Sequence, residues 1–151
     1  MLFYTHLLSG VIFFLFFNRF FHGGSEVGFF LLLLLGSILP DIDEAHSKIN
    51  QWSGALGKFI TFFVEHRGIF HSFILAFGLF IAVNLLWSNY YAFALFLGYV
   101  AHLTGDALTP LGVQPFYPFS EFRMSGPIKT GSWMEMLFAL GLILVIAKFF
   151  F

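Results

Sequence analysis

Residues 90–108, YYAFALFLGYVAHLTGDAL, form an apolar run of nearly membrane-spanning length that ends in a histidine and an aspartate, His102 and Asp106. A helix needs about 20 apolar residues to cross a hydrocarbon core about 30 Å thick. Further apolar stretches run over Leu2 to Phe21, Val27 to Leu39, Gly68 to Trp87 and Ser132 to Phe151. We therefore predict an all-α, polytopic membrane bundle of about five transmembrane helices, forming a single integral membrane domain over residues 1–151.

The composition supports a membrane protein and excludes other classes. Hydrophobic residues make up 59% of the 151 positions and charged residues only 10%, against about a quarter in soluble domains. The net charge of −1 provides no basic face, so we expect no nucleic-acid partner. Cysteine is absent, so a metal ion would have to be held by imidazole and carboxylate groups.

The second apolar stretch is short and ends at Pro40. As a helix it would span only about 20 Å, so it is either extended by neighbouring residues or stops inside the membrane. In the second case the proline, which ends the helix, and Asp41 would lie slightly below the headgroups in a recessed polar pocket. Between Glu44 and Glu65, lysines and aromatic residues at rough helical spacing predict an interfacial helix between the second and third transmembrane helices. The first stretch lacks the basic start and the cleavage pattern of a secretory signal, so we expect it to remain as a mature helix.

Four polar clusters interrupt the apolar runs, and alternate membrane crossings bring all of them to one side. They are His6, Asp41 with Asp43, His66 with His71, and His102 with Asp106. The loops on that side also carry most of the basic residues, namely Lys48, Lys58, Arg67, Arg123 and Lys129. The other side has only Arg19 and Lys148. By the positive-inside rule, the N-terminus and the polar clusters are predicted to be cytoplasmic.

His102 and Asp106 are four residues apart and share a helix face, so they could bind one ion, or the aspartate could orient the imidazole. The structural alternative is a buried hydrogen bond that ties helices together. His66 and His71 would diverge on a straight helix, so Gly68 is expected to mark the helix entry, with His66 in the preceding turn. Either histidine alone is more typical of an interface or a core than of a ligand, but with Asp41, Asp43 and His102 nearby we favour the ligand interpretation.

Asp41 and Asp43 follow a helix C-terminus, where negative charge opposes the helix dipole. This placement argues for a bound cation, although a solvated turn is the alternative. His6 lies one turn into an apolar helix and could also be an interfacial residue. Glu65 could serve as a base or be a solvated loop charge, and His22 and His46 are expected at the surface.

The candidate metal ligands number more than one four-coordinate zinc requires, which indicates one ion with outer partners or two ions. They are His6, Asp41, Asp43, His66, His71, His102 and Asp106. Such ligands suit a divalent transition metal, with zinc favoured and manganese possible. Excess ligands without thiolates favour a catalytic site, in which Asp41, Asp43, His71 and Glu65 are the candidate catalytic residues and the ion would lower the pKa of bound water.

These motifs, in this order, also carry a family resemblance. They are Thr5-His6 with Leu-Leu-Ser-Gly, Gly36-Ser37-Ile38-Leu39-Pro40-Asp41-Ile42-Asp43 with Ser47, His66-Arg67-Gly68 with His71-Ser72, and Gly98-Tyr99 with His102, Asp106, Thr109-Pro110 and Gly112. The chain resembles the YdjM family of membrane-bound metal-dependent hydrolases, also described as LexA-regulated inner-membrane proteins of bacteria and archaea. It departs from the family at Glu44, where such proteins often have histidine.

The Gly-Ser-x-x-Pro-Asp and His-Ser elements are also similar to those of zinc-dependent phospholipase C, a likeness that implies zinc and a phosphoester substrate. We predict a multi-pass hydrolase of the prokaryotic inner membrane that cleaves a lipid-borne ester, such as a phospholipid phosphoester, by a metal-activated water. Its partners would be membrane lipid and a lipid-like ester substrate. The alternative is a non-catalytic metal-binding membrane protein with a structural, sensing or transport role, although transporters often show repeats and midplane sites that are not evident here.

Overall fold

The computed structural model describes residues 1–63 and 68–150, and within these ranges it contains seven α-helices and no β-strand. The helices are α1 (Phe3–Phe17), α2 (Glu26–Ile38), α3 (Lys48–Ser53), α4 (Ala55–Phe63), α5 (Phe73–Leu86), α6 (Asn89–Ala107) and α7 (Trp133–Phe150). Short 3-10 turns follow α1 and α2 and precede α5, namely η1 (Asn18–Phe20), η2 (Leu39–Asp43) and η3 (Ile69–His71). The all-helical prediction is confirmed.

Each of the five apolar stretches contains one helix, but only two helical segments of the described chain are long and apolar enough to cross a membrane, Phe3–Phe20 and Trp133–Phe150. The five-span bundle therefore stays a prediction. The expected interfacial helix is two short helices, α3 and α4, rather than one. They are separated at Gly54, whose φ of 61° lies in the left-handed region that ends helices.

Serine side chains begin four of the helices. Ser25, Ser47, Ser72 and Ser88 stand at the N-caps of α2, α3, α5 and α6, and each hydroxyl accepts a hydrogen bond from a backbone N–H three residues later. Such a cap satisfies one of the unpaired N–H groups of the first turn. The start of each of these helices is therefore encoded locally.

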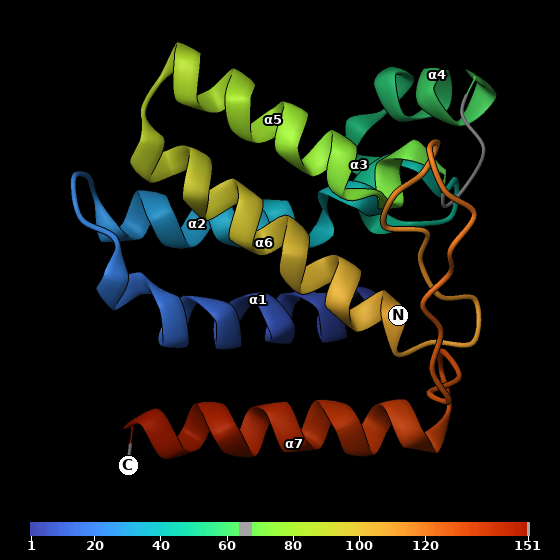
Figure 1. Cartoon of the computed structure of the whole chain (residues 1–151). Coiled ribbons are helices and arrows are strands. Elements are labelled where there is room, and N and C mark those ends of the chain that lie inside the picture. Colours follow the sequence, from blue (N-terminus) through green and yellow to red (C-terminus); the bar gives the residue numbers. More distant parts are fainter. Residues whose placement is uncertain (64–67, 151) are drawn as a thin grey trace.

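Helix α6 lies at the centre of the bundle, where it contacts α1, α2 and α5, while α7 packs against α1 (Figure 1). The closest packing is between α2 and α6. A Cβ on Gly36 would overlap the carbonyl oxygen of Leu95, and a Cβ on Gly98 would overlap that of Leu33. Small residues let two helix backbones approach in this way, so these glycines set the distance between α2 and α6.

The helices alternate in direction, so that the start of α1, the end of α2, the start of α5, the end of α6 and the start of α7 lie at one end of the bundle, beside α3, α4 and the 108–132 loop (Figure 1). We call this the loop end. It is the end at which the polar clusters of the sequence are expected.

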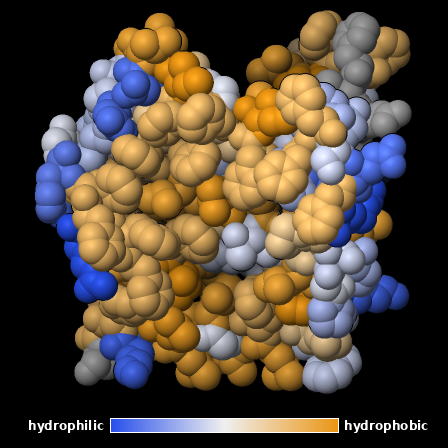
Figure 2. Space-filling model, viewed as in Figure 1, coloured by the Kyte–Doolittle hydropathy of each residue, from blue (hydrophilic) through white to orange (hydrophobic). Residues whose placement is uncertain are grey.

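The outer surface of the helices is strongly apolar. Figure 2 shows a broad hydrophobic band between hydrophilic residues at the two edges of the molecule. On α5, for example, Phe77 is 56% exposed and Leu85 is 78% exposed, and α7 exposes Leu144 to 62%. Soluble monomers rarely expose contiguous apolar surface of this extent, so the band is suited to lipid.

Candidate metal centre

Four segments bring buried histidines and aspartates together at the loop end. His6 comes from the first turns of α1, Asp41 and Asp43 from η2, His71 from η3, and His102 and Asp106 from the last turns of α6. Pro40 stands at the start of η2, where it ends the α-helix and turns the following aspartates toward the bundle. The side chains of His6, His71, His102 and Asp106 have no exposed surface.

Two overlapping groups of these side chains could each hold a metal ion. In each group, one nitrogen or oxygen per residue lies within 4.8 Å of the others; the groups are His6, Asp41, His102 and His71, His102, Asp106. His102 belongs to both. The cluster is therefore compact enough for one ion or two adjacent ions, and its nitrogen and oxygen ligands suit a divalent metal ion.

The imidazole of His102 is oriented by the backbone of α2. Its Nδ1 lies 2.9 Å from the carbonyl oxygen of Ser37, which can only accept, so Nδ1 carries the proton and donates it. Nε2 then has a free lone pair, and it lies 3.4 Å from Nε2 of His71 and 3.7 Å from Oδ1 of Asp41. A ligating histidine is typically held by its other ring nitrogen in this way.

His71 lies between two carboxylates. Its Nδ1 is 3.3 Å from Oδ2 of Asp43, and its Nε2 is 3.5 Å from Oδ2 of Asp106. The two carboxylates flank the imidazole, so negative charge that would attract a cation lies on both sides of His71.

His6 stacks on His102, with ring centroids 3.8 Å apart and an interplanar angle of 11°. Its Nε2 is 3.5 Å from Oδ1 of Asp106, yet neither ring nitrogen has a hydrogen-bond partner within the described part of the chain. Burying a polar group without such a partner costs free energy. A cation bound beside Asp106 would satisfy this imidazole, so the residues present fit a metal ion.

Asp106 also lies 2.5 Å, by its Oδ1, from the N-terminal ammonium group of Met1. The ammonium and the carboxylate are both buried. This contact shows that the carboxylate accepts a positively charged partner at the centre of the cluster, next to His6 and His71.

Asp41 differs from the other acids because 17% of its side chain is exposed. Burial raises the pKa of its carboxyl, the nearby His6 opposes this effect, and Asp106 adds to it. The exposed part of Asp41 lines a cavity of about 480 Å³ that is bounded by Met1–Phe3, Glu44, residues 46–49, Leu111 and Thr130. The cluster is thus open to a ligand on the side of Asp41.

The sequence-predicted residues divide into three sets. His6, Asp41, Asp43, His71, His102 and Asp106 are brought together, although neither candidate ligand group includes Asp43. Glu65 and His66 lie outside the described residues, as does Arg67. His22 and His46 are exposed as expected, and His46 lines the cavity over Asp41, as Glu44 does.

Two supporting residues were missed by the sequence analysis as parts of the site. The Ser37 carbonyl holds His102, and the hydroxyl of Tyr99 donates to the carbonyl of Phe70, 2.5 Å away, which fixes η3 and hence His71. Tyr99 precedes His102 by three residues on α6, so their common helix face was a usable signal. The role of the Ser37 carbonyl depends on helix packing and has no sequence signal.

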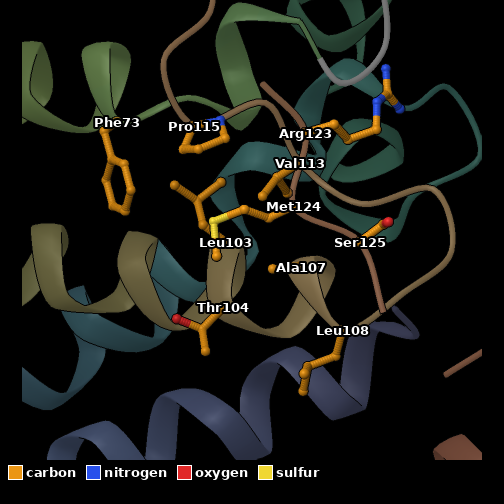
Figure 3. A pocket seen from close by; sticks show the side chains of 10 residues that line it. All are labelled: Phe73, Leu103, Thr104, Ala107, Leu108, Val113, Pro115, Arg123, Met124 and Ser125. Atoms are coloured by element: carbon orange, nitrogen blue, oxygen red, sulfur yellow. The ribbon is translucent and has the colours of Figure 1, made fainter. Parts of the chain in front are cut away.

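A second cavity, of about 510 Å³, lies between α6, the start of α5 and the 108–132 loop (Figure 3). Its lining is mostly apolar, with residues such as Leu103, Leu108 and Val113, and Arg123 is its charged member. The histidines and aspartates of the cluster are not among its lining residues. The smaller cavity over Asp41 is therefore the one that meets the candidate metal ligands.

Comparisons with known proteins agree with the membrane interpretation. The model of the family described as YdjM inner membrane protein matches residues 1–150. YvsG, an uncharacterized protein of Bacillus subtilis (strain 168), is 31% identical over 120 residues, which cover 78% of this chain and 74% of YvsG. The inner membrane protein YdjM of Escherichia coli (strain K12) is 30% identical over 118 residues, which cover 72% of this chain and 60% of that protein.

No solved structure matches the chain. The family and the Escherichia coli relative are named as inner membrane proteins, and none of the names, YvsG included, states a hydrolase activity. The likeness to zinc-dependent phospholipase C is not shown by these comparisons, so it stays a prediction.

Proposed function

Because the chain belongs to the YdjM family of inner membrane proteins, we propose that it is a membrane-embedded, metal-dependent hydrolase of a lipid-borne ester, with a phosphoester favoured. The observation that carries the proposal is the convergence of buried imidazoles and carboxylates on one point, with Asp41 facing a cavity. Ionisable groups buried in a membrane protein are costly and mark functional sites.

In this proposal His6, Asp41, His71, His102 and Asp106 hold one or two divalent cations, zinc or manganese. The carboxylate of Asp43 lies beside Nδ1 of His71 and thereby orients the imidazole. A bound ion would lower the pKa of a water molecule and polarise the ester oxygen. The Ser37 carbonyl keeps the proton of His102 on Nδ1, so that Nε2 stays available to the ion.

Asp41 is the residue through which substrate and water would reach the cluster, because it is the one exposed acid among the cluster residues of the described chain. The other carboxylates, Asp43 and Asp106, have no exposed side-chain surface. Of the three cluster carboxylates, Asp41 is the one that lines the cavity, so it is placed to accept a proton from water there.

We further propose that the protein crosses the inner membrane five times, with its N-terminus and the cluster on the cytoplasmic side. The hydrophobic band of Figure 2 supports a position in lipid. The five-to-two bias of Lys and Arg toward the loop-end segments supports the orientation. Lipid substrate would then enter laterally, with its tail in the bilayer and its ester at the cytoplasmic interface.

Hydrolysis assays on purified protein test the proposal. We expect turnover of lipid phosphoesters that is lost with a chelator, restored by zinc or manganese, and lost in Asp41→Asn and His71→Ala while the circular dichroism spectrum is unchanged. His22→Ala, at an exposed histidine outside the cluster, should keep full activity. A panel of lipid phosphoesters and carboxyl esters decides the substrate class. If metal-loaded protein turns over neither class, the hydrolase proposal is wrong and the cluster has a structural or sensing role.

A further inference from the structure

The cavity over Asp41 has a basic residue at its rim. Lys48, the first residue of α3, lines the cavity together with Asp41 and the start of α1. Its Nζ lies 5.0 Å from the centre of the Phe3 ring, and this ring contacts Trp52 edge to face at 5.5 Å. The aromatic ring attracts the ammonium group and keeps it at the rim rather than in bulk solvent.

The charge of the cluster makes a cation at this rim useful. Asp41, Asp43 and Asp106 supply three carboxylates, which balance the two charges of one divalent cation together with the Met1 ammonium on Asp106. An anionic group that enters over Asp41 therefore meets no surplus positive charge from one ion. Charge attraction is strong at a partly buried site, so a lysine facing the same cavity would offset the repulsion.

A second, smaller cavity of about 300 Å³ adjoins this one. It shares Leu111 and Thr130 with it and is lined by Lys129. Each of the two adjoining cavities is thus lined by one lysine, Lys48 from α3 or Lys129 from the 108–132 loop. Lys58 on α4 is exposed and belongs to the lining of neither cavity.

On the basis of the proposed hydrolase function, we propose that Lys48 binds the anionic phosphoryl group of a phospholipid headgroup in the cavity over Asp41 and thereby selects phosphoesters over uncharged esters. An ammonium group forms charge-assisted hydrogen bonds with phosphoryl oxygens. Lys48 is then a substrate-binding residue that does not hold the metal. Its removal should weaken lipid binding without changing the metal content.

A binding assay separates this inference from hydrolysis. In a Trp87→Phe/Trp133→Phe background Trp52 is the only tryptophan, and it contacts the ring beside Lys48. Its fluorescence is followed in detergent micelles during titration with dihexanoyl phosphatidic acid, dihexanoylglycerol or inorganic phosphate. We expect phosphatidic acid to bind most tightly, and Lys48→Gln to weaken its binding roughly tenfold, which is the scale of one lost charge-assisted contact.

Two variants serve as controls. Lys48→Arg keeps the charge and should restore binding, whereas Lys58→Gln removes an exposed lysine and should bind like the parent protein. Equal loss in Lys58→Gln, unchanged binding in Lys48→Gln, or a fall in metal content with Lys48→Gln would each overturn the inference. Equal affinity for inorganic phosphate would overturn the assignment to a lipid. Lys48-dependent binding without turnover would leave this inference standing and count against hydrolysis only.

Discussion

His102 is the residue that belongs to both groups of candidate metal ligands. We expect His102→Ala to lower the metal content of purified protein and to weaken metal affinity by more than about tenfold. Even the loss of a residue that only hydrogen-bonds to a metal ligand typically costs about tenfold in affinity. Asp106→Ala should act in the same direction. Elemental analysis of the purified variants measures the ratio of metal to protein.

Thr104→Ala is the matched control for this prediction. Thr104 lies on the same helix and is exposed, and its hydroxyl bonds to the carbonyl of Val100 within the helix. This variant should keep the full metal content. If a His102→Ala/Asp106→Ala double variant also kept it, α6 would not supply metal ligands.

At the scale of residues, the sequence predicted which side chains gather, because apolar runs leave few positions for histidine and aspartate. The pair His102 and Asp106 followed from helical spacing alone. The contact between Asp43 and Nδ1 of His71 could not be predicted from the sequence, because it depends on how η2 and η3 pack together. The contact of the Met1 ammonium with Asp106 joins residues 105 positions apart and has no local signal.

The packing of α2 against α6 positions the cluster, since η2 follows α2 directly and α6 carries His102. We expect Gly98→Ala to destabilise the protein by about 1–3 kcal/mol, the usual cost of overpacking a close contact. The new methyl group would overlap the Leu33 carbonyl, so α2 would have to move. Thermal unfolding in detergent, followed by circular dichroism, measures the change.

Gly78→Ala provides the comparison, because a Cβ at Gly78 of α5 meets no atom of the described chain within 4 Å. It should leave the stability unchanged or raise it by up to about 1 kcal/mol, since alanine favours the helix. Equal destabilisation by the two substitutions would mean that the α2 and α6 backbones do not approach closely at Gly98.

At the scale of elements, apolar length predicted where α1, α2, α5, α6 and α7 lie, and serines marked four of the helix starts. The division of the interfacial segment into α3 and α4 was not predicted, because a single glycine such as Gly54 can also lie inside a helix. The 108–132 segment carries four of the five prolines of the chain, and the structure contains there an isolated bridge between Val113 and Met124.

At the scale of the whole molecule, the apolar band and the polar ends together define how the bundle would lie in a bilayer. On the face shown in Figure 2 the band lies between the hydrophilic residues of the two edges, and α1, α2, α5 and α7 all carry exposed apolar side chains. Helix lengths alone identify only two candidate spans within the described residues. Shorter helices can still cross where loops and turns extend them or where the bilayer thins.

Reporter fusions test the orientation directly. Trp52 in α3 and Gly126 in the 108–132 loop belong to segments at the loop end, although α4, α5 and α6 lie between them in the sequence (Figure 1). With five crossings and a cytoplasmic N-terminus, fusions of alkaline phosphatase after either residue should be inactive, because this enzyme needs the oxidising periplasm. Green fluorescent protein fused at the same positions should fluoresce.

A fusion after His22, at the opposite end of α1, should give the reverse pattern and serves as the internal control. If Trp52 and Gly126 reported opposite sides, no single membrane face could hold both the lysine of α3 and the loop that carries Lys129. The first segment lines the cavity over Asp41, and the 108–132 loop lines both this cavity and the adjoining one. Such a result would contradict the topology and also the lipid-facing site built on it. If both fusions report the cytoplasm, the metal cluster and its cavity lie on the cytoplasmic side.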